Sequence, residues 1–420
     1  MTRPWTDRTV DGSRRTGPEV PIGSTTTPGT VPGVERGRVR SRWEVPTPAL
    51  LVDLDVLEAN LARAAALVAE GGVTLRPHVK THKCAAIARL QLEAGAAGLC
   101  VAKLGEAEAL LAAGVRPPQG FLLTTPVHGG LRDRLAALAT PSRAALRDRL
   151  AALGAGPGSG ISVVVDHPEQ VESLRGVSGG APLRVLVDLD VGLHRTGVVG
   201  PERAAELARL VASTPGLAFG GVQAYGGQWQ HIDDPDVRRD AVGKGMAVVA
   251  DAVDAIEAEG LEVGVRSGGG TGTLAADLEL GVLDELQLGS YALMDREYRD
   301  ALGRDPDLGD GGDWGQALWV QSTVVSANHE GFVTVDAGLK AFATDAGEPV
   351  WPAGGGRYAF FGDEHGLLTV SEHRPLRLGD RVELVPPHCD PTVDRYDVIH
   401  LVRGDEVVDI VPVDARGRSQ

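Results

Sequence analysis

Short apolar runs alternate with longer helical patterns through most of this 420-residue chain. Apolar runs of about five residues are typical of buried strands, and Ala- and Leu-rich runs such as 55–70 and 201–213 are typical of helices. The expected strands lie at residues 73–77, 98–102, 120–124, 161–166, 184–190, 218–225, 262–267 and 284–288. Eight strands that alternate with helices predict an α/β fold, a (β/α)8 barrel.

The pattern changes after the barrel. Short alternating runs separated by Gly, Pro and Asp predict an all-β domain over residues 311–415. The barrel domain is expected over residues 42–310, although its first strand, near 49–54, could instead join the β domain, as could a strand near 37–45. Residues 1–41 are rich in Gly, Pro, Ser, Thr and Arg and poor in large apolar residues, which predicts a disordered basic tail.

Composition limits the kinds of partner. The formal net charge of −16 argues against a nucleic-acid-binding protein and against binding to an anionic membrane. No apolar run reaches the roughly 18 residues of a membrane span. Three cysteines are too few for a disulfide framework and fit a reducing compartment, so we expect a cytoplasmic enzyme that acts on a small molecule.

Polar residues follow several of the predicted strands. Lys80 comes after the first strand, Arg195 after the fifth, and Tyr225 ends the sixth. The segments 267–273 and 287–291 follow the seventh strand and end the eighth. Because the carboxyl ends of the strands form the active face of a barrel, we expect these residues to meet in one site.

The first of these segments is dense in cations. The strand-like run that starts at Val73 stops at Pro77, and two His and two Lys then occur within six residues, among them His78 and Lys80. A lysine among apolar walls and other cations has a lowered pKa, and its neutral amine can form a Schiff base with a carbonyl cofactor. The alternative is a solvated basic loop, because charge clusters at loop starts are common.

The segment 267–273, Ser-Gly-Gly-Gly-Thr-Gly-Thr, presents backbone N–H groups with few Cβ atoms ahead of a helical pattern. Such a run favours a phosphate-binding loop, in which Ser267, Gly268, Gly269 and Thr271 would supply donors. The alternative is a flexible glycine-rich turn.

A further motif lies in the β domain. His388 and Asp390 stand two residues apart on a segment that we expect to be extended, so both side chains would point the same way. An imidazole and a carboxylate placed in this way can bind a divalent cation with open positions for water and substrate. The alternative is a turn with a capping aspartate and a surface histidine.

The segment Arg76-Pro77-His78-Val79-Lys80-Thr81-His82-Lys83 resembles the pyridoxal phosphate (PLP) attachment segment of the D-threonine aldolase and D-serine dehydratase family, which has the alanine-racemase type of fold. The resemblance covers about residues 45–412 and implies that Lys80 carries PLP. It assigns the loop 267–273 to the PLP phosphate and Arg195 to the cofactor ring and its phenolic oxygen.

Further cofactor contacts follow from the same resemblance. Gln287 stands where alanine racemases place an arginine against the pyridine nitrogen. The other residues expected to bind the cofactor are His78, Tyr225 and Tyr291. A surface arginine and a buried core tyrosine are the alternatives for Arg195 and Tyr225.

The segment that contains His388 and Asp390 resembles the aldolases of the family more than the dehydratases. D-Threonine aldolases and D-3-hydroxyaspartate aldolases have a similar His-Cys-Asp-Pro-Thr segment, which implies that His388 and Asp390 bind a divalent cation such as Mn²⁺, Zn²⁺ or Mg²⁺. D-Serine dehydratases of the family have Cys in place of Asp390. One departure is Gly226, where the aldolase pattern has a histidine proposed as the base for the β-hydroxyl proton. Either His231 or a metal-bound hydroxide is expected to replace it.

We therefore expect a PLP- and divalent-metal-dependent lyase that cleaves D-β-hydroxy-α-amino acids to glycine and an aldehyde, with Lys80 and His231 as catalytic residues. Three alternatives stay open: a D-serine or D-threonine dehydratase that forms a 2-oxo acid and ammonia, an amino-acid racemase, and a non-catalytic PLP-binding protein. In relatives of this fold the active site lies near a dimer interface, so we expect a homodimer. The expected partner is a small D-amino acid, with neither nucleic acid nor membrane.

Overall fold

The computed structural model describes residues 41–127, 129–139, 160–177, 181–302, 314–352, 356–370 and 375–420. The predicted basic tail lies outside the described residues, except for Ser41. A short 3-10 helix, η1 (Arg42–Glu44), replaces part of the strand expected near 37–45. The physical reason is local, because the side chain of Ser41 accepts the N–H of Trp43 and turns the backbone. Ser41 itself makes a single bridge with Glu406.

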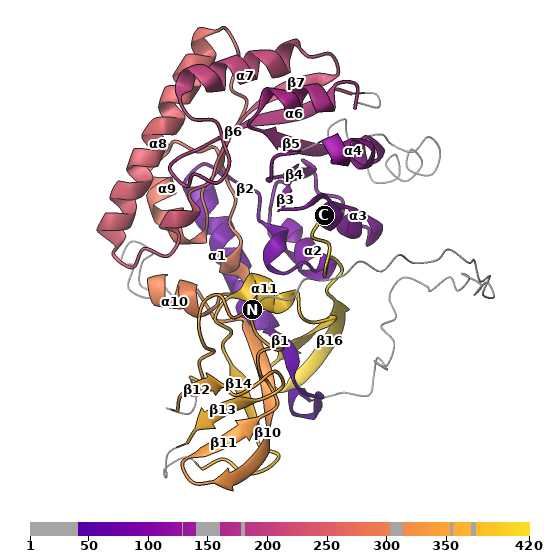
Figure 1. The fold of residues 1–420 in the computed structure, drawn as a ribbon, viewed down its shortest axis with the longest axis vertical. Helices are drawn as coiled ribbons and strands as arrows, with labels where there is room; N and C mark the ends of the chain where they lie inside the picture. Colours follow the sequence, from indigo (N-terminus) through magenta and orange to yellow (C-terminus); the bar gives the residue numbers. More distant parts are fainter. Residues whose placement is uncertain are drawn as a thin grey trace, which may run out of the picture. The chain divides into compact units, whose positions relative to one another are not determined.

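Eight parallel strands form the predicted barrel (Figure 1). They are β2 (Thr74–Leu75), β3 (Leu99–Val101), β4 (Phe121–Leu123), β5 (Ile161–Val165), β6 (Leu183–Leu189), β7 (Leu217–Ala224), β8 (Arg266–Gly268) and β9 (Glu285–Leu286). Neighbouring strands follow the order β2-β9-β8-β7-β6-β5-β4-β3. The end strands also meet, since the N–H of Ala97 donates to the carbonyl of Leu75 and the N–H of Cys100 to that of Pro77, both at 2.8 Å. These bonds close the ring.

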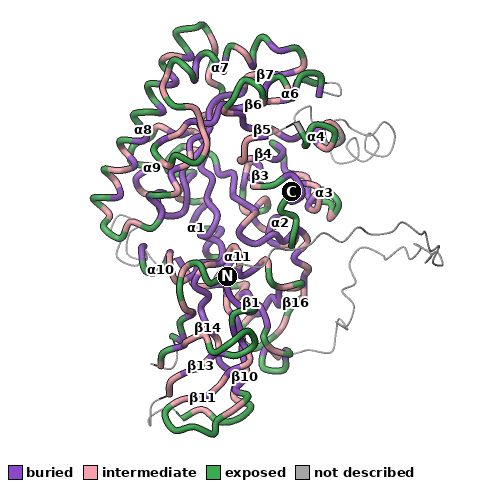
Figure 2. Tube along the Cα trace, in the orientation of Figure 1, coloured by how far each residue is buried: buried purple, intermediate pink, exposed green. Residues whose placement is uncertain are grey.

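Helices connect the barrel strands. Those described are α1 (Leu54–Glu70), α2 (Ala85–Glu93), α3 (Leu104–Ala112), α4 (Arg132–Ala139), α6 (Pro168–Leu174), α7 (Pro201–Ser213), α8 (Pro235–Ala258), α9 (Leu274–Leu280) and α10 (Arg296–Leu302). Aspartates define two of the starts: Asp53 accepts the N–H of Val56 at the start of α1, and Asp234 caps α8 ahead of Pro235. Figure 2 shows buried residues along the barrel strands and exposed residues on α7 and α8. Within the described ranges, no helix combines the length and the apolar character that crossing a membrane requires.

The β domain is a second sheet of eight strands. Its strands are β1 (Ala49–Asp53), β10 (Leu318–His329), β11 (Phe332–Val335), β12 (Tyr358–Phe360), β13 (Gly366–Thr369), β14 (Arg381–Leu384), β15 (Val398–Arg403) and β16 (Glu406–Pro412). The path runs β12-β13-β11-β10-β1-β15-β16, and β14 pairs with β10. Strand β1 lies between β10, which is antiparallel to it, and β15, which is parallel. The strand that precedes the barrel in the sequence thus belongs to the sheet of the β domain.

The two domains meet where β2 ends. The 3-10 helix η2 (Val79–Thr81) follows β2 and packs against α11 (Cys389–Val393) of the β domain. Nζ of Lys83 lies 2.7 Å from Oδ1 of Asp394, directly after α11. The N–H of Ala415 donates to the carbonyl of Lys83 at 2.9 Å. These contacts hold the predicted cofactor segment and the predicted metal segment together.

Candidate active site

A cavity of about 430 Å³ lies at the carboxyl ends of the barrel strands. This volume is typical of a small-molecule site. Six of the residues selected from the sequence line it: His78, Lys80, Arg195, Tyr225, Thr271 and Gln287. Further polar and aromatic residues line the cavity but were not predicted as site residues. Thr81 lies within the segment 76–83, beside Lys80, whereas the others stand in no recognisable motif: Thr124, Asp188, Gln223 and Tyr298.

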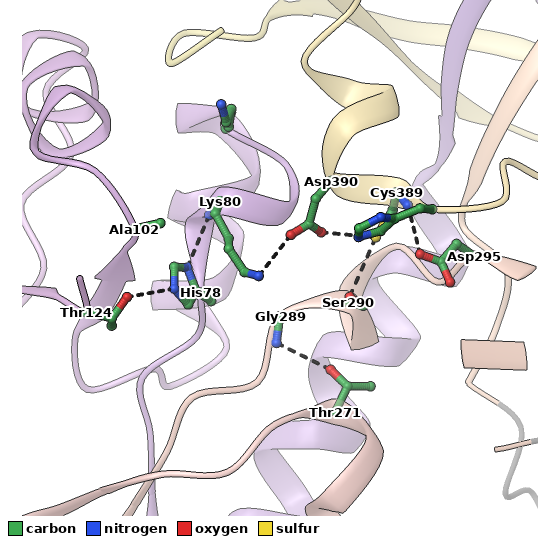
Figure 3. A network of polar contacts seen from close by, with 12 residues as sticks. His78, Lys80, Ala102, Thr124, Thr271, Gly289, Ser290, Asp295, Cys389 and Asp390 are labelled. Carbon is green, nitrogen blue, oxygen red and sulfur yellow. Dashed lines mark hydrogen bonds and ion pairs between the residues drawn. The ribbon is translucent and has the colours of Figure 1, made fainter. Parts of the chain in front are cut away.

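Lys80 lies in η2, and its ammonium group faces the β domain (Figure 3). Its Nζ lies 3.1 Å from Oδ2 of Asp390 in α11. The charge of Asp390 raises the pKa of Lys80 above its usual range and outweighs the opposing effect of burial. The sequence predicted a lowered pKa from apolar walls and other cations. That expectation is wrong for this structure, because a carboxylate from the other domain stands beside the amine.

His78 is buried beside Lys80 and is neutral. Burial, followed by the charge of Lys80, lowers the pKa of His78 well below its usual value. Its Nδ1 accepts the backbone N–H of Lys80 at 3.4 Å, so Nε2 carries the proton and donates to Oγ1 of Thr124 at 3.1 Å. Thr124 in turn donates to the carbonyl of Val101. This chain fixes the ring at the cavity wall.

Arg195 brings a second cation to the cavity. It follows β6 in a turn in which Oδ1 of Asp190 accepts the N–H groups of Gly192 and His194. The guanidinium carbon lies 5.5 Å from the centroid of the Tyr225 ring, which is the geometry of a cation–π contact. Tyr225 therefore forms part of the cavity wall and also positions the guanidinium of Arg195.

The glycine-rich loop leads from β8 into the 3-10 helix η5 (Thr271–Thr273). Thr271 lines the cavity. Its Oγ1 accepts the N–H groups of Gly289 and Tyr291, at 3.3 and 3.1 Å. The hydroxyl thus ties this loop to the segment after β9, and both segments border the same side of the cavity.

Ser267, Gly268 and Gly269 do not line the cavity, in contrast to Thr271. The hydroxyl of Ser267 turns to the barrel interior and donates to Oε1 of Glu285 at 2.7 Å. Gly269 has φ +69°, and a Cβ there would overlap the carboxylate of Asp277. Asp277 accepts the hydroxyl of Thr273 at 2.6 Å, and burial raises its pKa to about 7. These residues fix the conformation of the loop and do not face the cavity.

Thr81 adds a polar atom that needs a partner. The residue is fully buried and borders the cavity, yet its Oγ1 finds no hydrogen-bond partner within the described residues. A buried hydroxyl of this kind fits a ligand oxygen that accepts its proton. Together with the amine of Lys80, the guanidinium of Arg195 and the loop at Thr271, it makes the cavity suitable for a phosphorylated carbonyl cofactor such as PLP.

Gln287 and Tyr291 both follow β9, but only one of them faces the cavity. Gln287 lines it, and its Nε2 bonds Oγ of Ser267 at 2.9 Å. Tyr291 is fully buried; its hydroxyl accepts Nε2 of Gln91 at 3.4 Å and its ring packs edge-on against Trp314. Tyr291 contributes to the site through its backbone N–H alone.

The predicted metal residues begin α11. The sequence predicted an extended segment, but His388 is the N-cap of a short helix, so the two-residue alternation does not apply. Nδ1 of His388 lies 2.7 Å from Oδ2 of Asp345. A carboxylate at one ring nitrogen orients many metal-binding histidines, and Nε2 has no protein partner in the described part of the chain. Burial lowers the pKa of His388, but Asp390 and then Asp345 outweigh burial and raise it.

Asp390 lies between His388 and Lys80. Burial raises its pKa, but the charges of Lys80 and His388 outweigh burial and hold the carboxylate ionised, with its pKa below the usual range. Cys389 is buried, and its N–H donates to Oδ2 of Asp295 at 2.8 Å. Across the described ranges, no group of three or more metal-binding side chains occurs. A cation here would take His388 and Asp390 as its protein ligands, and the metal stays a prediction.

His231, the predicted base, does not line the cavity. It is exposed, and its ring packs edge-on against Tyr298 with 4.5 Å between the ring centroids. Tyr298 is the residue of this pair that borders the cavity. At Gly226 a Cβ would overlap the ring of Trp229, so the local packing excludes the histidine that the aldolase pattern has there.

The alanine racemase N-terminal domain family has a sequence model that matches residues 52–297. This chain belongs to that family. A second model, for a serine dehydratase domain, matches residues 317–402 within the β domain. The predicted resemblance to the D-threonine aldolase and D-serine dehydratase family is thereby confirmed, as are the barrel and the β domain as a fold class.

Several characterised proteins are similar over most of the chain. The 3-hydroxy-D-aspartate aldolase of Paracoccus denitrificans (strain Pd 1222) is 36% identical over 90% of this chain and 93% of its own length. The D-threonine aldolase of Arthrobacter sp is 35% identical over 90% of this chain and 94% of its own. The solved D-threonine aldolase of Filomicrobium marinum is 37% identical with a TM-score of 0.81, over 91% of this chain and 98% of that structure.

A dehydratase is also similar, but less so. The D-threo-3-hydroxyaspartate dehydratase of Delftia sp. (strain HT23) is 30% identical over 72% of this chain and 73% of its own length. The aldolases are more similar over more of the chain. The fold and these relatives support a PLP-dependent lyase of the aldolase type.

Proposed function

We propose that this protein is a PLP- and divalent-metal-dependent aldolase that cleaves D-β-hydroxy-α-amino acids to glycine and an aldehyde. The observation that carries the proposal is the 3.1 Å contact between Nζ of Lys80 and Oδ2 of Asp390. In this proposal Lys80 of the barrel holds the cofactor and Asp390 of the β domain binds the metal, so the contact would join the two functions at one place. A substrate attached at the cofactor would therefore have its β-hydroxyl within reach of a cation on His388 and Asp390.

In this proposal the barrel would hold the cofactor and the β domain would hold the metal. Lys80 would hold PLP, Arg195 would meet its phenolic oxygen, and Thr81 and Thr271 would lie near its phosphate. When bound, PLP accepts the electron pair released as the Cα–Cβ bond breaks. Asp345 would keep His388 in the tautomer that presents Nε2 to a cation. Such a cation lowers the pKa of a hydroxyl group that it contacts.

Two findings support a metal at this place. His388 is already oriented by Asp345 at 2.7 Å. In addition, a D-threo-3-hydroxyaspartate dehydratase variant, 25% identical, has been described in a metal-free form. The dehydratase alternative keeps one argument, because Gly226 removes the histidine expected of an aldolase. Lys80 could then serve as the base at Cα.

The deciding experiment is an assay of products. The purified protein is incubated with PLP, Mn²⁺ and D-threonine or 3-hydroxy-D-aspartate, and glycine and aldehyde are measured against 2-oxo acid and ammonia. A parallel sample contains a chelator. Glycine that is lost on chelation supports the aldolase. A 2-oxo acid makes the protein a dehydratase, and racemised substrate without either product makes it a racemase.

We propose in addition that the protein is a homodimer, because the resemblance implies an active site near a dimer interface. Light scattering coupled to gel filtration should give twice the mass of one chain. A monomer that is fully active would contradict this expectation.

A further inference from the structure

A chain of hydrogen bonds connects Gln287 with the barrel interior. Nε2 of Gln287 lies 2.9 Å from Oγ of Ser267 and 3.3 Å from Oε1 of Gln223. Nε2 of Gln223 lies 2.9 Å from Oδ1 of Asp188 and 3.0 Å from the carbonyl oxygen of Thr124. All of the side chains in this hydrogen-bond network are buried. Because an amide can be turned either way, its direction follows from its fixed neighbours.

One end of this hydrogen-bond network is fixed by an ion pair. Oε2 of Glu285 lies 2.9 Å from Nε of Arg76, and both side chains are 4% exposed. In an ion pair with a guanidinium, the oxygens of a carboxylate act as hydrogen-bond acceptors. Ser267, 2.7 Å from the other oxygen of Glu285, must therefore use its single proton on that carboxylate. Its oxygen is left as an acceptor, so the group of Gln287 that meets it must be the NH₂.

The other end fixes the same direction independently. The carbonyl oxygen of Thr124 can only accept, so Gln223 must present its NH₂ to Thr124 and Asp188. The oxygen of Gln223 then points to Gln287, and it also requires a donor there. This holds whether or not Asp188 is ionised, because the carbonyl of Thr124 has no proton to give. Both ends thus require the NH₂ of Gln287 to face the interior.

The side-chain oxygen of Gln287 is the atom that remains to accept a hydrogen bond from a ligand. Both protons on Nε2 are used, by Ser267 and Gln223, and Gln287 lines the cavity. Its Oε1 has no protein partner in the part of the chain that the structure describes. We infer that Gln287 is a fixed hydrogen-bond acceptor in the cofactor site and holds the ring nitrogen of PLP in its protonated form. The inference rests on the proposed function for the identity of the ligand, and on the resemblance for the ring nitrogen as the atom that Gln287 meets.

The direction of this bond sets the electronic character of the cofactor. The arginine that alanine racemases place against the pyridine nitrogen can only donate, and so favours the unprotonated ring. Gln287 in this chain, with its donors already used, can only accept. A protonated ring carries a positive charge and accepts electrons more strongly, which suits the cleavage of a carbon–carbon bond. Gln287 thus determines the protonation state of the cofactor's ring nitrogen.

The test observes the ring nitrogen directly. The protein is loaded with PLP that carries ¹⁵N in the ring, and the ¹⁵N chemical shift is recorded by NMR across neutral pH. We expect the wild type to give the shift of a pyridinium ion. Gln287→Met, which keeps the size but removes the acceptor, should move the shift toward that of neutral pyridine. Ser267→Ala should keep the pyridinium shift, because Gln223 still directs the amide.

A second measurement does not depend on the fold of one variant. PLP and its 1-deaza analogue, which has C–H in place of the ring nitrogen, are titrated into the cofactor-free protein. PLP should bind at least about tenfold more tightly than the analogue, as for one charge-assisted hydrogen bond, and Gln287→Met should remove most of that difference. Gln321→Met is the matched control, because Gln321 is a buried glutamine in the sheet of the β domain.

The outcomes separate this inference from the proposed function. A neutral ring nitrogen in the wild type overturns the inference, even if glycine is formed. A pyridinium shift that persists unchanged in Gln287→Met also overturns it. A pyridinium shift that responds to Gln287→Met, in a protein that forms no glycine, supports the inference and contradicts the aldolase. A chain that takes up no PLP overturns both.

Discussion

Nζ of Lys80 and Oδ2 of Asp390 lie 3.1 Å apart, although one residue belongs to the barrel and the other to the β domain. Each is the main charge that stabilises the other in its ionised form. The pair of Lys83 and Asp394, at 2.7 Å, repeats the contact one turn further along. The position of α11 against η2 is therefore held by two ion pairs, and the first of them lies in the proposed active site.

Lys80→Ala is expected to remove the visible absorbance band of lysine-bound PLP and to lower the rate of glycine formation by at least about 10²-fold. The reason is that PLP would have no amine to attach to. The measurement is an absorbance spectrum after gel filtration, together with the product assay. Lys244→Ala, on the exposed side of α8, is the control. An unchanged band in Lys80→Ala would show that another residue holds the cofactor.

Asp345→Asn is expected to weaken metal binding by about 10- to 100-fold, because the amide no longer fixes the tautomer of His388 or raises its basicity. Titration of the protein with Mn²⁺ against a competing chelator measures the affinity. The absorbance of bound PLP should stay unchanged, since Asp345 is no part of the cofactor cavity. Asp363→Asn, at an exposed loop of the β domain, is the matched control. Equal affinities in the two variants would remove Asp345 from the metal site.

Much of the fold could be predicted because strand and helix periodicity reports burial locally. Where pairing partners decide the outcome, the sequence was less informative: β8 begins at Arg266, opposite Val222 of β7, and not at residue 262 as predicted. Strand β1 illustrates the same point, because only the neighbouring strands β10 and β15 assign it to the β domain.

The candidate site could be predicted where a residue stands at a strand end in an unusual motif, as Lys80 does. Residues such as Gln223 were missed, because a single polar residue in an apolar strand gives no indication of its partners. The charge state of Lys80 could not be predicted either, because Asp390 reaches it from a distant part of the chain. His231 was selected for its closeness in sequence, but the turn after β7 directs it to the outside.

Asp277 is expected to make stability fall as the pH rises. Burial raises its pKa in the folded protein from 3.8 to about 7, so its contribution to stability is fully present below about pH 4 and is lost as the pH rises to about 7. Asp277→Asn cannot ionise and should flatten this fall, by on the order of 1 kcal/mol or more. Calorimetric Tm values of the cofactor-free protein at acidic and neutral pH measure it. Asp233→Asn, at an exposed site, should keep the wild-type slope, and a wild-type slope in Asp277→Asn would refute the assignment.

Gly226→Ala is expected to destabilise the protein by about 1–3 kcal/mol, because overpacking forces buried neighbours to move. A Cβ at this position would overlap the ring of Trp229, which is 7% exposed and is also packed closely against Gly245. Gly226→His, which restores the histidine of the aldolase pattern, should therefore lower stability further without raising the rate. Urea unfolding of the single variants measures the effect.

The cause can be isolated with a double variant and a matched glycine. Trp229→Leu makes room, so Gly226→Ala should cost less in the Trp229→Leu background, and the difference is the coupling energy of the pair. Gly243→Ala lies in α8, where a Cβ would meet nothing within 4 Å, and should stabilise the protein by up to about 1 kcal/mol. If Gly226→Ala proved as harmless as Gly243→Ala, Trp229 would not be what excludes a histidine at position 226, and the missing base would have to be explained by the reaction itself.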